Sequence, residues 1–156
     1  MLLLNTSSVV DDFRMQYFQV NSIEKADHFM AKLQQDSSPE AIGYVAALHF
    51  IKSRLYKFPL KKMKYFNMGK SALEALIKEH PYNIELRYIR YTLQKKVPKF
   101  LAYNTHISED LSMIKTALPQ SGMPTKIKSL ILRNILGLNE MTKKDKNEFE
   151  NLLINL

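Results

Sequence analysis

The residues with the clearest chemical capacity lie in the segment 82–104, YNIELRYIRYTLQKKVPKFLAYN, which contains four tyrosines, two arginines and three lysines. Basic side chains bind phosphate or carboxylate groups, and exposed aromatic rings stack on bases. At about 100° per residue, Tyr88 and Tyr91 fall on one apolar side of a helix. Arg87 and Arg90 fall on the flank between this side and a second apolar side. The pattern favours an inner helix whose arginines are paired. The alternative is an arginine–tyrosine platform for nucleic acid or phosphate.

Six lysines lie near the ends of two consecutive expected helices: Lys61, Lys62, Lys64, Lys95, Lys96 and Lys99. The start of one helix and the end of the next lie together in an antiparallel hairpin, so the six are expected to form one patch. Cations suit a helix C-terminus, but the first three lysines open a helix, where the dipole disfavours them. We therefore interpret the patch as the best candidate contact surface, with a solvated rim as the simpler alternative.

The sequence contains no motif for catalysis or for binding a metal or cofactor. It has no cysteine and only four histidines, without HExxH or Glu-x-x-His spacing. His106 and Glu109 form one isolated pair, which is too few ligands for a metal site. A glycine-rich phosphate loop and a GxSxG elbow are also absent. We therefore expect a non-enzymatic protein with no metal and no cofactor.

The composition is that of a globular, basic and helical chain. Of the 156 residues, 46% are hydrophobic, 24% are charged and only four are glycine, which favours helices over a many-stranded sheet. The formal charge of +8 is uneven, because residues 59–103 hold ten basic and three acidic side chains. A basic block of this kind attracts an acidic partner. No apolar run approaches the ~18 residues that a membrane span needs.

Apolar periodicity, prolines and capping residues predict an all-α fold of seven helices, give or take one. Ser38 and Asn83 are expected helix caps, Asn21 is expected to cap with Glu24, and Ser108 is expected to cap a later helix. Short connections indicate stacked antiparallel hairpins in a single domain that spans residues 1–156. The helical segments are expected within 9–20, 22–35, 40–58, 60–80, 84–96, 109–118, 125–137 and 143–156.

The start of the chain, MLLLNTSSVV, has three leucines and no basic residue. A secretory signal has a positive region and about 7–15 apolar residues, so this stretch is too short to be one as written. We expect residues 1–10 to be flexible or the remnant of an export signal. The protein would be cytoplasmic as written, or exported if the signal is truncated.

One stretch, ALIKEHPYNIELRYIR, resembles the join between two tetratricopeptide (TPR) helices. Gly69 falls where such repeats have a small residue, and Leu73 and Leu76 fall at their apolar positions. Pro59 lies where the first helix of the repeat should still run, and no second copy follows at a 34-residue offset. The resemblance therefore implies a TPR-like arrangement rather than a TPR array.

The chain also resembles a family of small helical proteins from Bacteroidota bacteria. The similar segments are FPLKKMKYFNMGKSALEALIKEHPYNIELRYIRYTLQKKVPKFLAYN and the following ISED, about a third of the chain. Members usually carry an N-terminal export signal. The resemblance implies a fold and a lineage, but no activity.

These observations predict a TPR-like scaffold or adaptor that binds a protein or peptide, acidic in character, along a groove between helices. Aromatic anchors would supply affinity and lysines would orient the approach. Two alternatives remain: nucleic-acid or anionic-surface binding through the basic segment 59–103, which predicts steep salt dependence, and a small apolar ligand inside a helical bundle. The residues expected at the surface are Tyr56, Lys61, Lys62, Lys64, Tyr65, Arg87, Tyr88, Arg90, Lys95, Lys96, Lys99 and Tyr103.

Overall fold

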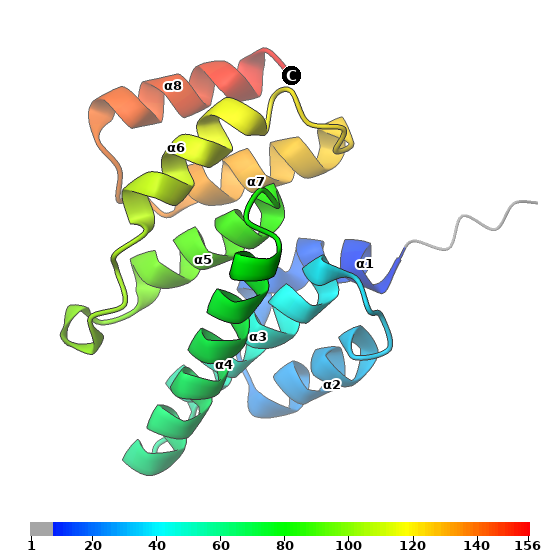
Figure 1. Cartoon of the computed structure of the whole chain (residues 1–156), viewed down its shortest axis with the longest axis vertical. Coiled ribbons are helices and arrows are strands. Elements are labelled where there is room, and N and C mark those ends of the chain that lie inside the picture. Colours follow the sequence, from blue (N-terminus) through cyan, green and yellow to red (C-terminus); the bar gives the residue numbers. More distant parts are fainter. Residues whose placement is uncertain (1–7) are drawn as a thin grey trace, which may run out of the picture. The chain divides into compact units, whose positions relative to one another are not determined.

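The computed structural model of the protein describes residues 8–156 (Figure 1). These residues form eight α-helices and two short 3-10 helices and contain no strand, which confirms the all-α prediction. The chain divides into two units, one ending at Pro81 and the other beginning at Tyr82. The expectation for residues 1–10 falls mostly on residues 1–7, which lie outside the described part, whereas Val9 already opens a helix.

The first unit contains four α-helices and one 3-10 helix. They are α1 (Val9–Gln16), η1 (Tyr17–Gln19), α2 (Ile23–Leu33), α3 (Pro39–Leu55) and α4 (Pro59–Glu79). The second unit contains α5 (Ile84–Lys96), η2 (Lys99–Leu101), α6 (Ile107–Ala117), α7 (Thr125–Gly137) and α8 (Lys143–Ile154). Each segment expected to be helical holds an α-helix, so the count is one more than the seven expected.

The helix starts follow local chemistry at most positions. The side chains of Ser38 and Asn83 accept hydrogen bonds from the backbone N–H groups of Ala41 and Leu86, as expected for caps. Ser22 caps α2 instead of Asn21, by accepting from the N–H of Lys25. The prediction was wrong by one residue because serine and asparagine have similar capping preferences.

The start of α6 also differs from the prediction. The helix begins at Ile107 with His106 as N-cap, so Ser108 lies inside its first turn. The backbone N–H of His106 donates to the side-chain oxygen of Gln94 on α5, at 3.1 Å. This contact between distant segments satisfies the start of the helix without a serine cap, which local sequence cannot show.

The core of the first unit is built around α3, which is buried on most sides. Figure 1 shows α4 running alongside α3, and Gly69 allows their close approach. A Cβ added to Gly69 would lie 2.8 Å from the carbonyl oxygen of Ala46 and 2.8 Å from a ring carbon of Phe50. Aromatic packing joins α1 to α2 and α3, since the Phe13 ring lies 4.9 Å from Phe29 and 5.2 Å from Tyr44.

The second unit is built around α5, which is buried on both of its apolar sides. Tyr88 and Tyr91 lie on one buried side and Ile89 lies on the other. Helix α6 packs against α5, and α7 packs against α8 (Figure 1). The last helix contributes Phe149 to the core. The inner-helix interpretation therefore matches the position of α5.

Candidate binding surfaces

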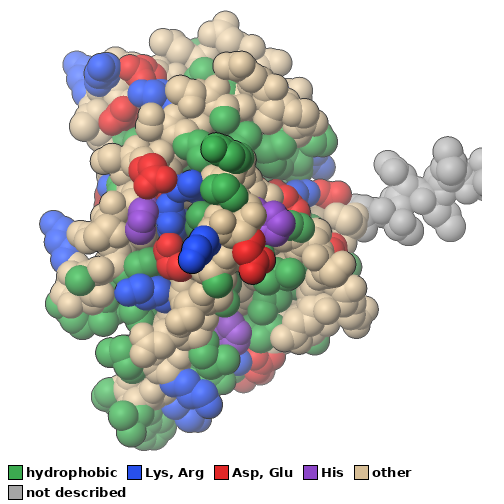
Figure 2. Space-filling view, viewed as in Figure 1, with side chains coloured by type: hydrophobic (Ala, Val, Ile, Leu, Met, Phe, Trp, Pro, Cys, Tyr) green, Lys and Arg blue, Asp and Glu red, His purple; other side chains and the backbone are tan. Residues whose placement is uncertain are grey.

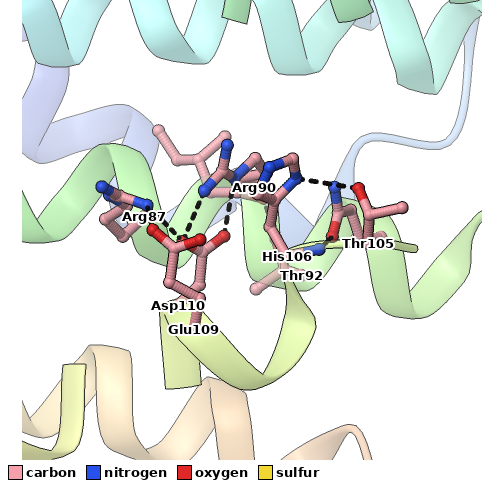
Figure 3. A network of polar contacts seen from close by, with 9 residues as sticks. Arg87, Arg90, Thr92, Thr105, His106, Glu109 and Asp110 are labelled. Atoms are coloured by element: carbon pink, nitrogen blue, oxygen red, sulfur yellow. Dashed lines mark hydrogen bonds and ion pairs between the residues drawn. The ribbon is translucent and has the colours of Figure 1, made fainter. Parts of the chain in front are cut away.

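The two arginines of α5 are held by carboxylates of α6 (Figure 3). The Nε of Arg90 donates to Oδ2 of Asp110 at 2.7 Å, and its Nη2 donates to Oδ1 at 2.7 Å. The Nη1 of Arg87 donates to Oε1 of Glu109 at 2.6 Å and to Oδ1 of Asp110 at 3.0 Å. Such two-pronged contacts fix both the position and the orientation of a guanidinium.

This arginine–carboxylate network is largely out of solvent. Asp110 is 0% exposed and Arg90 is 2% exposed. The hydrogen bond from Arg87 lowers the pKa of Glu109 from its ordinary value. An anion would have to displace carboxylates that already occupy the guanidinium donors. The network therefore fixes α6 on α5, which is the paired role that the sequence favoured for these arginines.

The other expected surface residues of the second unit divide into two groups. Tyr88 and Tyr103 are buried, and Tyr88 accepts a hydrogen bond from the side-chain amide of Asn134 at 2.8 Å. Lys95 lies 3.5 Å from the carboxylate of Glu140. Lys96 and Lys99 are exposed. The buried tyrosines thus pack within the fold in this structure, and the exposed lysines remain at the end of α5.

The remaining expected residues belong to the first unit, and three of them form a ladder of side chains between α3 and α4. The Tyr65 ring is stacked between His49, at 5.8 Å, and Tyr56, at 4.9 Å. The ammonium of Lys61 lies 5.0 Å from the centre of the Tyr56 ring. Lys52 also belongs to this cluster. Neither His49 nor Lys52 was among the candidate residues expected from the sequence. Lys52 follows His49 by three residues, and Tyr56 follows Lys52 by four. At helical periodicity this spacing places the three residues on one face.

The tyrosine hydroxyls of this ladder are paired with each other, whereas Nδ1 of His49 is buried without a hydrogen-bond partner among the described residues. The hydroxyls of Tyr56 and Tyr65 share a hydrogen bond, and this bond, with the charges of Lys52 and Lys64, lowers the pKa of Tyr65. Lys52 donates to Asp27 on α2 at 2.6 Å. Burial, followed by the charge of Lys52, lowers the pKa of His49. The ring faces stack on one another, so the ladder offers few open faces to a nucleic-acid base.

Exposed apolar and basic side chains gather at the end of the α3–α4 pair. Phe58 is 70% exposed and Leu60 is 87% exposed. Figure 2 shows hydrophobic and basic side chains together at the lower end of the molecule, where Figure 1 places this end of the pair. We call residues 54–64 the basic tip. Its exposed basic residues are Arg54, Lys57, Lys61, Lys62 and Lys64.

The basic tip lies in a stretch of the sequence that has no acidic residue. Between Glu40 and Glu74 the sequence has seven basic residues and no acidic one. Within the part of the chain that the structure describes, the five basic residues of the tip make no ion pair. Arg54, Lys57, Phe58 and Leu60 were missed in the sequence analysis, although the acid-free run was a usable signal. Lys61, Lys62 and Lys64 therefore lie in a field of uncompensated positive charge.

The two groups of three expected lysines belong to different units. Lys61, Lys62 and Lys64 belong to the first unit and Lys95, Lys96 and Lys99 to the second. Their union into one patch stays a prediction.

A depression elsewhere in the first unit offers less. An open depression of about 510 Å³ lies beside α1 and α2, with Val9, Met15 and Phe29 next to Asp12 and Lys32 in its wall. This mixed lining does not resemble the largely apolar pocket that a small apolar ligand would need. Within residues 8–156 no three His, Asp or Glu side chains are grouped to hold a metal ion. Over the same residues no helix has the length and apolarity to cross a bilayer.

The fold and the tip define an all-helical protein with an uncompensated basic surface. Comparison with protein-family models, curated proteins and solved structures finds no match for the chain.

Proposed function

We propose that the protein is a non-enzymatic helical binding module that docks on an acidic partner through the basic tip. The observation that carries this proposal is that, within residues 8–156, the five exposed basic side chains of the tip make no ion pair, in a stretch of sequence with no acidic residue between Glu40 and Glu74. Uncompensated charge creates a local potential that speeds and orients the approach of an acidic surface. The exposed Phe58 and Leu60 supply apolar anchors, which charge alone would not provide.

The anchors favour one of the alternatives for the partner. Nucleic acid presents phosphates, but it offers no apolar layer for Phe58 and Leu60, and the ring faces of the ladder are already stacked. An acidic partner with an apolar component fits both parts of the tip. The residues expected to contribute are therefore those of the first unit, from Tyr56 to Tyr65.

The resemblances also enter as proposals. We take the α3–α4 pair as TPR-like and the chain as related to the Bacteroidota proteins. The close approach at Gly69 supports the first, because TPR helices have a small residue where they pack closely. The scaffold function follows from the same likeness, with the tip replacing the expected groove as the main contact.

Two charge-matched variants test the proposal. The tip-lysine variant carries Lys57→Gln, Lys61→Gln, Lys62→Gln and Lys64→Gln. The control-lysine variant removes the same charge elsewhere, by Lys78→Gln, Lys126→Gln, Lys143→Gln and Lys144→Gln. All eight lysines are exposed. The probe is a fluorescently labelled polyglutamate peptide, whose anisotropy is followed at about 50 and 150 mM salt.

We expect the wild type to bind polyglutamate and to weaken with salt. The tip-lysine variant should lose at least about tenfold in affinity, and the control-lysine variant less than about threefold, because local potential and not net charge attracts the probe. Equal losses in the two variants would contradict the proposed function.

A further inference from the structure

Phe58 and Leu60 flank Pro59, the first residue of α4, and both project from the end of the helix pair. The backbone of Leu60 is fixed within the first turn of α4, and Phe58 is its N-cap residue. Proline at the first helical position is compatible with the helix and restricts the backbone. Phe58, which is 70% exposed, and Leu60, which is 87% exposed, therefore belong to an ordered part of the chain and not to a fraying end. The apolar pair is displayed outward on a rigid support.

The lysines surround this apolar pair at short range. Lys57 precedes Phe58, and Lys61, Lys62 and Lys64 follow Leu60. Four residues of α-helix span about 6 Å along the axis, so all three lysines of α4 lie within that distance of Leu60. Apolar faces of interfacial helices are buried about 5–10 Å into the boundary between headgroups and acyl chains. At that depth the lysines of the tip would lie at the level of the headgroups.

The same chemistry occurs independently in the second unit. Phe100 is 84% exposed in η2, directly after Lys99 and two residues after Pro98. Lys96 is exposed at the nearby end of α5. Each unit therefore displays an exposed phenylalanine within two residues of a proline and near lysines, at the end of a helix. A single exposed phenylalanine needs no explanation, but the recurrence of this combination points to a common type of surface.

We propose that the acidic partner of the tip is an anionic lipid bilayer, with Phe58 and Leu60 inserted among the acyl chains and the lysines against the headgroups. The inference rests on the proposed function and names its partner. A bilayer is acidic outside and apolar beneath, in the order in which the tip presents lysines and apolar side chains. A folded protein would need a preformed pocket for two adjacent projecting side chains inside an acidic rim. A bilayer accommodates them by local rearrangement.

Flotation of vesicles with the full chain tests this proposal. One vesicle contains phosphatidylcholine with about a third phosphatidylglycerol, and the other contains phosphatidylcholine alone. The two lysine variants are compared with a tip-apolar variant, Phe58→Ser with Leu60→Ser. Its matched control is Tyr82→Ser with Ile154→Ser, which are similarly exposed at 85% and 80%. All changed side chains are on the surface, and circular dichroism checks that each variant is folded.

We expect the wild type to bind anionic vesicles at least about tenfold more tightly than neutral ones. The tip-lysine variant should lose about 600-fold, because each of the four lysines contributes about fivefold near an anionic membrane. The tip-apolar variant should lose at least about tenfold on vesicles while it retains polyglutamate binding. Both control variants should stay within about threefold of wild type.

The outcomes separate this inference from the proposed function. Tip-dependent binding of polyglutamate without binding of vesicles would overturn the lipid proposal and leave an acidic protein segment as the partner. Vesicle binding that is insensitive to both tip variants would also overturn it. Binding of a single-stranded oligonucleotide at about 150 mM salt, tighter than that of vesicles and lost in the tip-lysine variant, would assign the tip to nucleic acid. Failure of tip dependence with every probe would overturn both proposals.

Discussion

The basic tip of the first unit and the arginine network of the second are both rich in positive charge, but they differ in what faces that charge. Arg87 and Arg90 meet two carboxylates that lie about twenty residues later in the chain, in α6. The lysines of the tip meet none in the described residues. A count of charges along the sequence gives both regions the same sign and hides this difference. Compensated charge holds a fold together, and uncompensated charge is available to a partner.

The largest expected effect comes from breaking the compensated region. Asp110→Asn should destabilise the protein by about 3–5 kcal/mol, because it leaves the buried guanidinium of Arg90 without its counter-charge. The control is Glu109→Gln, whose side chain is 58% exposed and should cost less than about 1 kcal/mol. Urea unfolding followed by circular dichroism measures both. Similar losses in the two variants would show that the network is not a structural lock.

The next effect concerns the helix pair that carries the tip. Gly69→Val should destabilise by about 2 kcal/mol, because its side chain would enter the space of the Ala46 carbonyl and the Phe50 ring. Gly137→Val is the matched control, since nothing lies within 4 Å of an added Cβ there. Thermal unfolding of both variants tests the prediction. An unchanged midpoint for Gly69→Val would mean that α3 and α4 need no close approach.

A smaller effect on stability is expected to have opposite signs at the two ends of α4. Lys62→Glu should stabilise the protein by about 0.5–1 kcal/mol, because a negative charge in the first turn of α4 suits the helix dipole. Lys78→Glu, in the last turn of the same helix, should destabilise by a similar amount. Urea unfolding at low salt measures both, and opposite signs are the expected result. A stabilised Lys62→Glu variant that binds anionic probes less well would show that the tip trades stability for binding.

The smallest effect depends on pH and contrasts His49 of the stacked ladder with Glu109 of the arginine network. In the folded protein the pKa of His49 is lowered from its ordinary 6.5. As the pH falls, this histidine is therefore protonated in the unfolded chain before it is protonated in the folded one. Its contribution to stability is complete above about pH 6.5 and is lost as the pH falls below that value. The pKa of Glu109 is also lowered, from 4.5, so its contribution is lost only on further acidification.

Unfolding midpoints between about pH 7.5 and 5.5 should therefore fall less in His49→Gln than in wild type. A Glu109→Gln variant should follow wild type over this range. Identical pH profiles for His49→Gln and wild type would remove His49 as the cause.

Helix positions were largely predictable from the sequence, because periodicity, proline and capping residues act locally. The segment 125–137 shows this most clearly, since α7 occupies the same residues. The errors occurred where distant residues decide. The start of α6 depends on Gln94, and the burial of Arg90 depends on its pairing with Asp110, twenty residues later in the chain.

The candidate surface was predictable in part for the same reason. Lys61, Lys62 and Tyr65 were expected, because lysines at a helix start conflict with the dipole and tyrosines are common anchors. The exposure of Phe58 and Leu60 could not be expected, because an apolar residue near a proline fits a buried loop as well as a projecting one. Burial is decided by packing between α3 and α4, which no local pattern encodes.

The stacked ladder gives the tip an optical property of its own. The chain has no tryptophan, so its near-ultraviolet signal comes chiefly from eight tyrosines and eight phenylalanines. Tyr56 and Tyr65 are stacked at 4.9 Å, a separation at which their electronic transitions couple, and Lys61 lies over the outer ring. A ligand that draws Lys61 away from Tyr56 would alter the tyrosine circular dichroism. Occupancy of the tip can therefore be followed without any attached label.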